Sequence, residues 1–410
     1  MNDLTRFLPM SLVATLLVLL PILVLADEFQ VSNLDDSGPG SLRQAIIEAN
    51  TLPGPHLIQF QFDLVGIILL DSPLPELDES MNITGPSSGL VTIDGNGLNQ
   101  PFLIEEDAVV TISHLTLSNG QGELGGAIVN FGELTLEHMF ITGNSADFGG
   151  GGISNEGLLL ISNSTISANS VGDSGIGGGL ENFGGSVLIV DSLVSDNTAD
   201  FGAGIDNFGQ MEIRRSTLRN NQGGLGGAIG NTDALLIVNS TLSGNSADSG
   251  GGIDNFDGQL ELLHVTIAGN SADEGGGIWS NVAFTSKNSL IVTSLDGGDC
   301  DLQPTLPPLV LGNNLDSDGS CTDFQSTTIA DLDLQSLTDN GGPTQTHALG
   351  SASAAVNAAD DCTAIDGTTP VSEDQRGVER PQGEHCDIGA FELESDDEED
   401  LIFTDRFEGS

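Results

Sequence analysis

Residues 244–255 read GNSADSGGGIDN, and close variants occur at 143–155 (GNSADFGGGGISN), 196–207 (DNTADFGAGIDN) and 269–281 (GNSADEGGGIWSN). A triple glycine after an acidic residue is compatible with a phosphate-binding loop, a calcium loop or a turn. A phosphate-binding loop occurs once, between a strand and a helix, and carries a lysine near its end. This stretch recurs and has no lysine, so its glycines are better explained as sharp corners of a repeat.

The repeat has a period of about 25 residues, which is typical of solenoid proteins. An aliphatic residue follows each glycine cluster at Ile128, Ile153, Leu180, Ile205, Ile229, Ile253 and Ile278. Two residues later comes a first asparagine column, with Ser280 in the last repeat: Asn130, Asn155, Asn182, Asn207, Asn231 and Asn255. A second asparagine column comprises Asn144, Asn169, Asn197, Asn221, Asn245 and Asn270.

Apolar residues alternate with other residues ahead of the second asparagine column, as at Leu235 and Ile237. This alternation predicts short strands with one buried face, and the period is too short for two helices plus turns. Each repeat is therefore predicted to be one coil of a β-solenoid, with coils stacked in parallel roughly 4.8 Å apart. Identical asparagines would then stack, and their amides would form hydrogen-bonded ladders without any ligand.

The charge of the chain is strongly one-sided. It has 9 basic and 60 acidic residues, which gives a formal net charge of −51. A field of this sign repels nucleic acid and attracts cations. We therefore expect no nucleic-acid partner and no cofactor, and Ca²⁺ is the alternative that the charge favours. The repeats lack the GGxGxD nonapeptide that builds calcium into other β-rolls, so any Ca²⁺ would bind in loops or diffusely.

The N-terminus predicts export. Residues 1–26 contain Arg6, a long apolar run and the small-residue end Val24-Leu25-Ala26, which is typical of a cleaved Sec signal peptide. The alternative is an uncleaved N-terminal anchor, because the run is close to the length that spans a bilayer. Pro9 and Pro21 favour cleavage, and no transmembrane segment is expected after the signal is removed.

Four cysteines lie in the last third of the chain: Cys300, Cys321, Cys362 and Cys386. In an exported chain disulfides are the expected state, and three pairings are possible. The favoured pairing joins Cys300 to Cys321 and Cys362 to Cys386, because each bond closes a short loop beyond the repeats. No Cys-x-x-Cys or paired histidine spacing supports a zinc site.

Several stretches resemble known bacterial families. GGAI at 125–128 and 226–229 resembles the repeats of chlamydial-type polymorphic outer-membrane proteins and, more broadly, pectin-lyase-like right-handed parallel β-helices. FQVSNLDDSGPGSLRQAIIEAN (29–50) is similar to the CSLREA domain, although Gly40 stands where that motif has its cysteine. DNGGPTQTHAL (339–349) and DQRGVERPQGEHCDIGAFE (374–392) resemble the choice-of-anchor Q domain. The resemblance implies an all-β right-handed parallel β-helix at a bacterial surface.

These observations divide the chain into five segments. SLRQAIIEAN places Leu42, Ala45, Ile46 and Ala49 at helical spacing behind Ser41, which predicts a short capping helix. The predicted segments are a signal peptide (1–26), a cap with irregular first coils (27–120), regular coils (121–295), a cysteine-containing anchor-Q-like segment (296–394), and an acidic linker with a C-terminal tag (395–410).

Glu181 and Asp206 are the strongest candidates for chemistry. Each follows the inward aliphatic residue of its coil, so the two should lie outward on adjacent coils, about 5 Å apart. That separation suits a retaining glycosidase, and the pair is also a candidate Ca²⁺ site. The favoured interpretation is nevertheless a solvated acidic face on an acidic protein.

Other enzymatic signals are incomplete. Asn231-Thr232-Asp233 matches one fragment of the polygalacturonase signature, but the other motifs of that family are missing. Arg215 should stack beside Asp191 on the adjacent coil, which a solvated salt bridge explains more simply than a lyase site. The six histidines are expected to be isolated from one another. Trp279 is the sole tryptophan, and packing beneath the C-terminal segment is favoured over stacking on a sugar.

The sequence therefore predicts an exported, non-enzymatic β-solenoid that acts in adhesion or surface interaction. Surface glycans or proteins are the expected partners, the chain is expected to be a monomer, and its location is extracellular or at the outer-membrane surface of a Gram-negative bacterium. The alternative is a polysaccharide lyase, hydrolase or carbohydrate-binding protein on the same fold. An enzyme would need an acid, base or ion cluster in one groove, whereas an adhesin needs only its surface.

Overall fold

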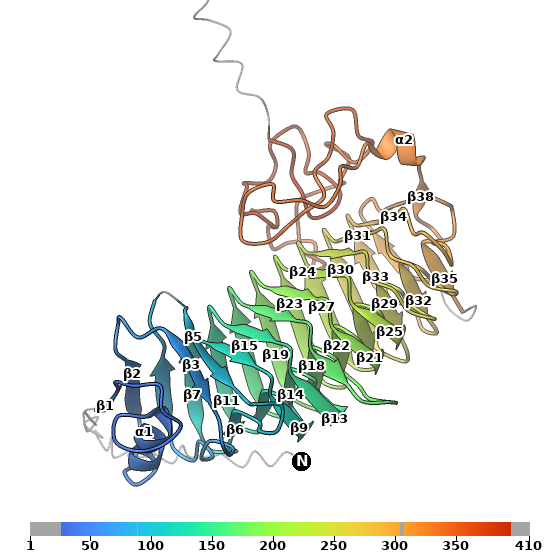
Figure 1. Cartoon of the computed structure of the whole chain (residues 1–410). Helices are drawn as coiled ribbons and strands as arrows, with labels where there is room; N and C mark the ends of the chain where they lie inside the picture. The colour runs from blue at the N-terminus through green and yellow to red at the C-terminus, as the bar shows by residue number, and fades with distance from the viewer. Residues whose placement is uncertain (1–25, 88, 304–306, 395–410) are drawn as a thin grey trace, which may run out of the picture.

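The protein is a parallel β-helix with a loop-rich C-terminal segment folded against one side (Figure 1). A computed structural model describes residues 26–87, 89–303 and 307–394. Strands on successive coils pair in parallel in each of the four sheets. The predicted all-β parallel solenoid is therefore confirmed. The predicted signal peptide and the C-terminal linker and tag lie outside the described residues, apart from Ala26.

Two sheets of 12 strands run the length of the solenoid. Sheet A contains β1 (Asp27–Val31), β2 (His56–Phe60), β4 (Met81–Thr84), β7 (Val109–Ser113), β11 (Glu133–Glu137), β15 (Leu158–Ser162), β19 (Ser186–Val190), β23 (Gln210–Arg214), β27 (Ala234–Val238), β30 (Gln259–Leu263), β33 (Thr285–Lys287) and β36 (Leu309–Leu311). Sheet B contains β3 (Gly66–Leu69), β5 (Val91–Asp94), β8 (Thr116–Ser118), β12 (Phe140–Thr142), β16 (Thr165–Ser167), β20 (Leu193–Ser195), β24 (Thr217–Arg219), β28 (Thr241–Ser243), β31 (Thr266–Ala268), β34 (Leu290–Val292), β37 (Leu315–Asp316) and β38 (Gln325–Ser326).

Two shorter sheets complete the coils, one of nine strands and one of five. Sheet C contains β6 (Phe102–Ile104), β10 (Ile128–Asn130), β14 (Ile153–Asn155), β18 (Leu180–Asn182), β22 (Ile205–Asn207), β26 (Ile229–Asn231), β29 (Ile253–Asn255), β32 (Ile278–Ser280) and β35 (Cys300–Leu302). Sheet D contains β9 (Gln121–Leu124), β13 (Ser145–Gly149), β17 (Ser170–Val171), β21 (Thr198–Phe201) and β25 (Gln222–Leu225).

The glycines of the repeat form the corner that leads into sheet C. Gly250 has φ +61°, a left-handed conformation that glycine adopts without steric cost. A Cβ atom at this position would collide with the carbonyl oxygen of Ile253. The corner lets Ile253 point into the core, where it is fully buried. The sequence GGGIDN is thus a turn followed by a three-residue strand.

Both asparagine columns form buried ladders. In the second column each Nδ2 donates to Oδ1 of the asparagine on the next coil, over 2.9 to 3.0 Å from Asn144 to Asn270. The first column makes equivalent bonds of 2.7 to 2.9 Å from Asn130 to Asn255, whose Nδ2 donates to Oγ of Ser280. Each amide also bonds to backbone groups, so the ladders tie side chain and corner together.

The N-terminal end is capped by α1 (Leu42–Ala49), as the sequence predicts. The hydroxyl of Ser41 accepts a hydrogen bond from the backbone N–H of Gln44, and the four predicted apolar positions are buried. Covering the first coil shields apolar groups that no further coil would bury. Within the residues described, neither this helix nor α2 (Ile329–Leu332) has the length and apolar character needed to cross a bilayer.

The solenoid extends beyond residue 295, where the glycine repeats end. β35, β36 and β37 continue sheets C, A and B, and Cys300 occupies the register position of the inward Ile278. Cys300 and Cys321 form a disulfide that is part of the main core, so this bond lies within the last coil instead of beyond the repeats. The boundary predicted at 295/296 is therefore too early, because this coil has only Gly297 and Gly298 before a cysteine, instead of three glycine or alanine residues before an aliphatic residue.

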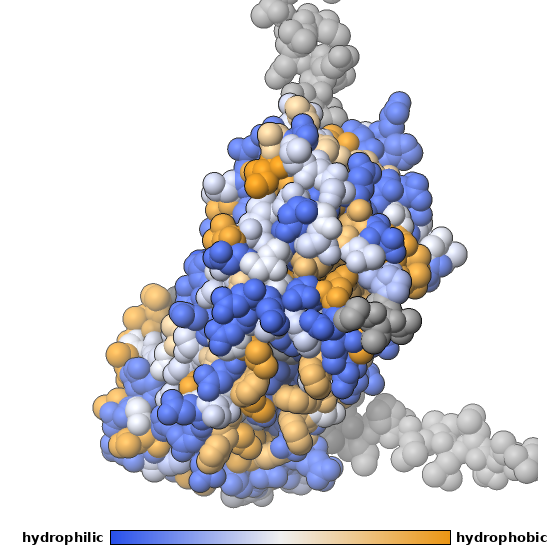
Figure 2. All heavy atoms as spheres, turned by 90° about the vertical axis from the view of Figure 1, so that its right-hand side faces the viewer, coloured by the Kyte–Doolittle hydropathy of each residue, from blue (hydrophilic) through white to orange (hydrophobic). Residues whose placement is uncertain are grey.

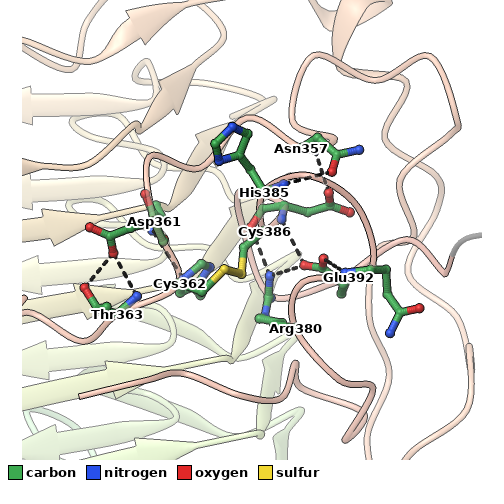
Figure 3. Close-up of a disulfide and its surroundings, with 12 residues drawn as sticks. Asn357, Asp361, Cys362, Thr363, Arg380, His385, Cys386 and Glu392 are labelled. Carbon is green, nitrogen blue, oxygen red and sulfur yellow. Dashed lines mark hydrogen bonds and ion pairs between the residues drawn. A yellow bond between two sulfur atoms is a disulfide. The ribbon is translucent and has the colours of Figure 1, made fainter. Parts of the chain in front are cut away.

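The C-terminal segment, residues 329–394, covers the outer face of sheet B. Oγ1 of Thr217 donates to the Gln345 carbonyl over 2.6 Å, and Oγ1 of Thr241 donates to Gln375 Oε1 over 2.6 Å. The second disulfide, Cys362 to Cys386, holds this segment together (Figure 3). Both disulfides have the favoured pairing.

A buried ion pair lies beside this disulfide (Figure 3). Nη1 of Arg380 is 2.7 Å from Oε2 of Glu392, and both side chains are almost fully buried. The loop-rich segment is thus an ordered layer held by covalent, ionic and hydrogen bonds.

Asn197→Ala should lower the free energy of unfolding by about 3 kcal/mol, because it removes two ladder bonds and leaves buried neighbours without partners. Chemical denaturation followed by far-UV circular dichroism measures the change. Gln210→Ala, an exposed polar truncation, is the matched control and should change stability by less than about 0.5 kcal/mol. Equal effects of the two substitutions would argue against the ladder as a main source of stability.

The double variant Cys362→Ser/Cys386→Ser should loosen the C-terminal segment while the coils stay folded, because this disulfide joins two parts of the segment and no strand of the solenoid. Limited proteolysis with mass spectrometry should show cleavage within 329–394 and a resistant fragment that retains β-sheet circular dichroism. Unchanged resistance of the segment to protease would contradict this prediction.

Candidate binding cleft

The residues after the inward aliphatic positions form one column on the outside of sheet C. In register order the column includes Glu181, Asp206, Gly230, Asp254 and Trp279. Glu181 and Asp206 are paired on adjacent strands, as the repeat predicts. The column is not a solvated face, however, because Glu181, Asp206 and Asp254 are only 4%, 3% and 6% exposed. The expectation of a solvated acidic face is therefore wrong.

The column is buried because two walls rise on either side of it. One wall follows the first asparagine column and includes Phe208 and Phe256. The other wall comes from sheet D and the bridges that continue it, and includes Phe201 and Leu225. Between them lies a cleft of about 600 Å³, lined by Ile176, Phe201, Gly202, Asp206, Phe208, Leu225, Gly230, Asn231, Thr232, Ser249, Asp254, Phe256, Glu274 and Trp279.

Strands of the cleft, β21, β25, β29 and β32, lie on the side of Figure 1 that Figure 2 turns toward the viewer. On that face, apolar side chains gather below a band of hydrophilic ones (Figure 2). Phe256 is 53% exposed and Phe201 is 40% exposed. Exposed rings grouped in a hollow are a feature of ligand-binding surfaces.

Asp206 has the least compensated carboxyl group in the cleft. Its Oδ2 is buried and has no hydrogen-bond partner among the described residues. Burial, with the nearby carboxylates of Glu181 and Asp254, raises the pKa of Asp206 to about 7. Burying a carboxylate without a partner is costly, so the group is partly protonated near neutral pH.

The neighbouring acids are better satisfied. Oγ of Ser154 donates to Glu181 over 2.8 Å, and Oγ of Ser249 donates to Asp254 over 2.8 Å. Burial raises the pKa of Glu181 and raises the pKa of Asp254 to about 6, although each hydroxyl lowers it. Glu181 does not line the cleft, whereas Asp206 and Asp254 do. The predicted Glu181/Asp206 pair therefore does not act on the cleft as a pair.

Gly230 separates the two carboxyl groups that reach the cleft. It lies between Asp206 and Asp254 in the column, which are therefore two coils or roughly 10 Å apart along the axis. A Cβ atom at Gly230 would lie 2.6 Å from Oδ1 of Asp206. The lack of a side chain leaves the floor of the cleft open between the two acids.

The structure does not bring the Glu181/Asp206 column together as a three-ligand metal site. The described residues contain one such group of three acids with ligand atoms within 4.8 Å of one another, Glu76, Asp78 and Glu105. Two of these residues are exposed and the third is partly exposed. Ca²⁺ binding, whether at Glu181 and Asp206 or in loops, stays a prediction.

Trp279 is not packed beneath the C-terminal segment, because that segment covers sheet B and Trp279 is on sheet C. Its ring instead lines the cleft and stacks with Phe256, with centroids 6.4 Å apart and planes 6° from parallel. Its indole Nε1 is buried without a hydrogen-bond partner in the part of the chain that is described. Packing favours the cleft position because the last glycine corner turns Trp279 outward.

Two other pairs of candidate residues lie outside the cleft. The predicted salt bridge forms, with Nε and Nη2 of Arg215 donating to the two oxygens of Asp191 over 2.7 and 2.8 Å. His114 and His138 are not isolated, since their rings lie 4.9 Å apart on adjacent coils. The repeat pattern does not predict this pair, because His114 lies in an irregular coil before the regular repeats begin.

The phenylalanine wall was also missed by reasoning from the sequence, which judged an aromatic platform poorly supported without tyrosine. Its signal is a phenylalanine directly after a ladder asparagine, at Phe131, Phe183, Phe208 and Phe256. Phe183 and Phe208 lie on adjacent coils, with ring centroids 6.2 Å apart and ring planes tilted by 56°. A search for residues at a constant offset from the asparagines would have found this column.

No protein-family model and no curated protein matches the chain. Among solved structures it is similar to a PL6 family alginate lyase, AlyGC, with 13% sequence identity and a TM-score of 0.38. The match covers 88% of this chain and 60% of the lyase. This level of similarity has no bearing on activity. The CSLREA, repeat-family and anchor-Q resemblances stay predictions.

Asp206→Asn should stabilise the protein at alkaline pH. Because the folded-state pKa of Asp206 is raised from 3.8 to about 7, the folded chain binds more protons between these values, and its stability falls as pH rises. The variant should exceed the wild type by on the order of 4 kcal/mol at pH 8, with the difference vanishing toward pH 4. Denaturation curves across this range measure it.

The exposed Asp173→Asn is the matched control and should show no such pH-dependent gain. Parallel stability curves for the wild type and Asp206→Asn would mean that Asp206 is not held in an unfavourable environment.

Proposed function

We propose that the protein is an exported, non-enzymatic interaction protein that binds its partner through the cleft on sheet C. The observation that carries the proposal is the set of exposed rings around a hollow on an otherwise rigid solenoid. Phe201 and Phe256 are held at fixed positions by strands and ladders, so little conformational entropy is lost when a ligand covers them. Rigid aromatic side chains are frequent anchors of binding surfaces.

A binding role fits the chemistry of the cleft better than catalysis does. Of the described residues that line it, none is lysine, arginine or histidine. A lyase needs a base together with a group that neutralises the substrate's acid, and a retaining glycosidase needs two carboxyl groups about 5 Å apart. Asp206 and Asp254 are instead two coils, or roughly 10 Å, apart along the axis. The proposal therefore keeps adhesion or surface interaction ahead of polysaccharide cleavage.

Export and surface display belong to the same proposal. The two disulfides fit an oxidising compartment, and the net charge of −51 suits a soluble, extended rod that resists self-association. The N-terminal apolar run supplies the route of export.

Arrays of glycans and of surface proteins, read for both binding and cleavage, test this function with the full mature chain. Phe256→Ala should weaken capture of the bound ligand at least about tenfold, because an exposed ring at the centre of a cleft is an interface anchor. Phe140→Ala, which removes a ring of similar exposure (51%) on sheet B, is the matched control and should leave binding unchanged. Cleavage of a polysaccharide that is lost in Asp206→Asn would overturn the proposal.

A further inference from the structure

The acids of the cleft lack the basic partners that two buried acids of the C-terminal segment have. Glu392 is paired with Arg380 over 2.7 Å, and Asp374 with Arg376 over 2.8 Å. The cleft contains Asp206, Asp254 and Glu274, but its described lining has no basic side chain. The charge of this site is thus uncompensated within the protein, and a cationic ligand would complement it.

A polar atom inside the cleft also has no partner. Asp206 is 3% exposed, lines the cleft, and its Oδ2 makes no hydrogen bond to any described residue. An ionised carboxylate in this position is stabilised when a positive charge comes within a few ångströms, since water does not screen the interaction there. The unpartnered Oδ2 of Asp206 is a second observation, separate from the excess of acidic residues in the cleft, and it points to a ligand.

The walls determine what kind of cation fits. Phe256 and Trp279 stack in parallel at 6.4 Å, and Phe201 and Phe208 line the same hollow. The faces of aromatic rings attract cations, and most strongly those that are weakly hydrated. A hydrated metal ion needs several converging oxygens, and the acids lining this cleft do not form a cluster of three close ligand atoms. A primary ammonium would likewise need three acceptors.

We infer that the cleft binds a quaternary ammonium group, with its alkyl substituents against the aromatic walls and its positive charge above the carboxyl groups of Asp206 and Asp254. This inference rests on the proposed function and names the chemistry of the partner. An oxygen near the ammonium, such as a hydroxyl, would accept a hydrogen bond from the unpartnered Nε1 of Trp279. Gly230 leaves room for the substituents between the two acids.

Calorimetric titration of the full mature chain with choline tests the inference, with 3,3-dimethylbutan-1-ol as a neutral compound of the same shape. Choline should bind at least about tenfold more tightly than the alcohol, because only choline offers the charge. Asp206→Asn and Trp279→Leu should each weaken choline binding about tenfold, whereas Asp173→Asn should not. Circular dichroism and thermal melts show that each variant is folded.

The pH dependence provides a second measurement. Choline affinity should rise from pH 5 to pH 8 as the acids ionise. The other carboxyl groups around Asp206 are Glu181 on the adjacent strand, Asp254 two coils away on sheet C, and Glu274, which lines the same cleft. The rise should be reduced in Asp206→Asn. A lysine-containing peptide serves as a primary ammonium for comparison. The inference would be overturned if choline did not bind, or if the alcohol or the lysine peptide bound as tightly as choline.

Two further experiments distinguish a membrane headgroup from a free molecule as the source of the ligand, and the quaternary ammonium inference from the proposed function. Co-sedimentation with phosphatidylcholine vesicles shows whether the group is recognised on a membrane headgroup or only as a free molecule. If Phe256→Ala abolishes capture of an array ligand but choline neither binds nor competes, the quaternary ammonium is wrong and the interaction function stands. If choline binds while the array ligand is unaffected by Phe256→Ala, the proposed function fails instead.

Discussion

The axial register of the coils is the constraint on which the rest of the structure depends. Each coil must place its asparagine amide within 3.0 Å of the one on the next coil, and the same step positions every other residue of the repeat. A shift of one residue would turn Ile253 outward and Asn255 off its ladder. This constraint explains why the length of the repeat varies from 24 to 27 residues, whereas the spacing from the corner glycine to the first-column asparagine is the same in each repeat.

Much of the fold could be predicted because its determinants repeat. Ile253, Asn255 and the helix behind Ser41 each follow a local pattern, and the structure places them as expected. The burial of Asp206 could not be read in the same way, because its walls come from Phe201 and Phe208 in segments that are polar on average. The last coil was missed because Cys300 replaces the inward aliphatic residue, although two left-handed glycines, Gly297 and Gly298, still precede it.

The core and the floor of the cleft draw on different residues of the same short strand. In β29, Ile253 points into the core, Asn255 extends a ladder, and Asp254 between them lies on the floor of the cleft. The two outer positions are confined to a few residue types, whereas the middle position takes serine, glutamate, aspartate, glycine or tryptophan in successive coils. Chemistry in this protein is therefore varied one coil at a time against a constant frame.

Gly230 shows how such a frame can hold a site without a dedicated loop. The cleft floor is opened at this coil by the omission of a side chain, while the backbone path of β26 matches that of its neighbours. The pocket is thus a gap in the outward column of side chains on sheet C, and the coil that carries the glycine sets its position along the solenoid axis. Moving that gap by one coil would shift the hollow by about 4.8 Å without a change in fold. The spacing of the coils thus fixes the positions along the surface at which outward side chains can be placed.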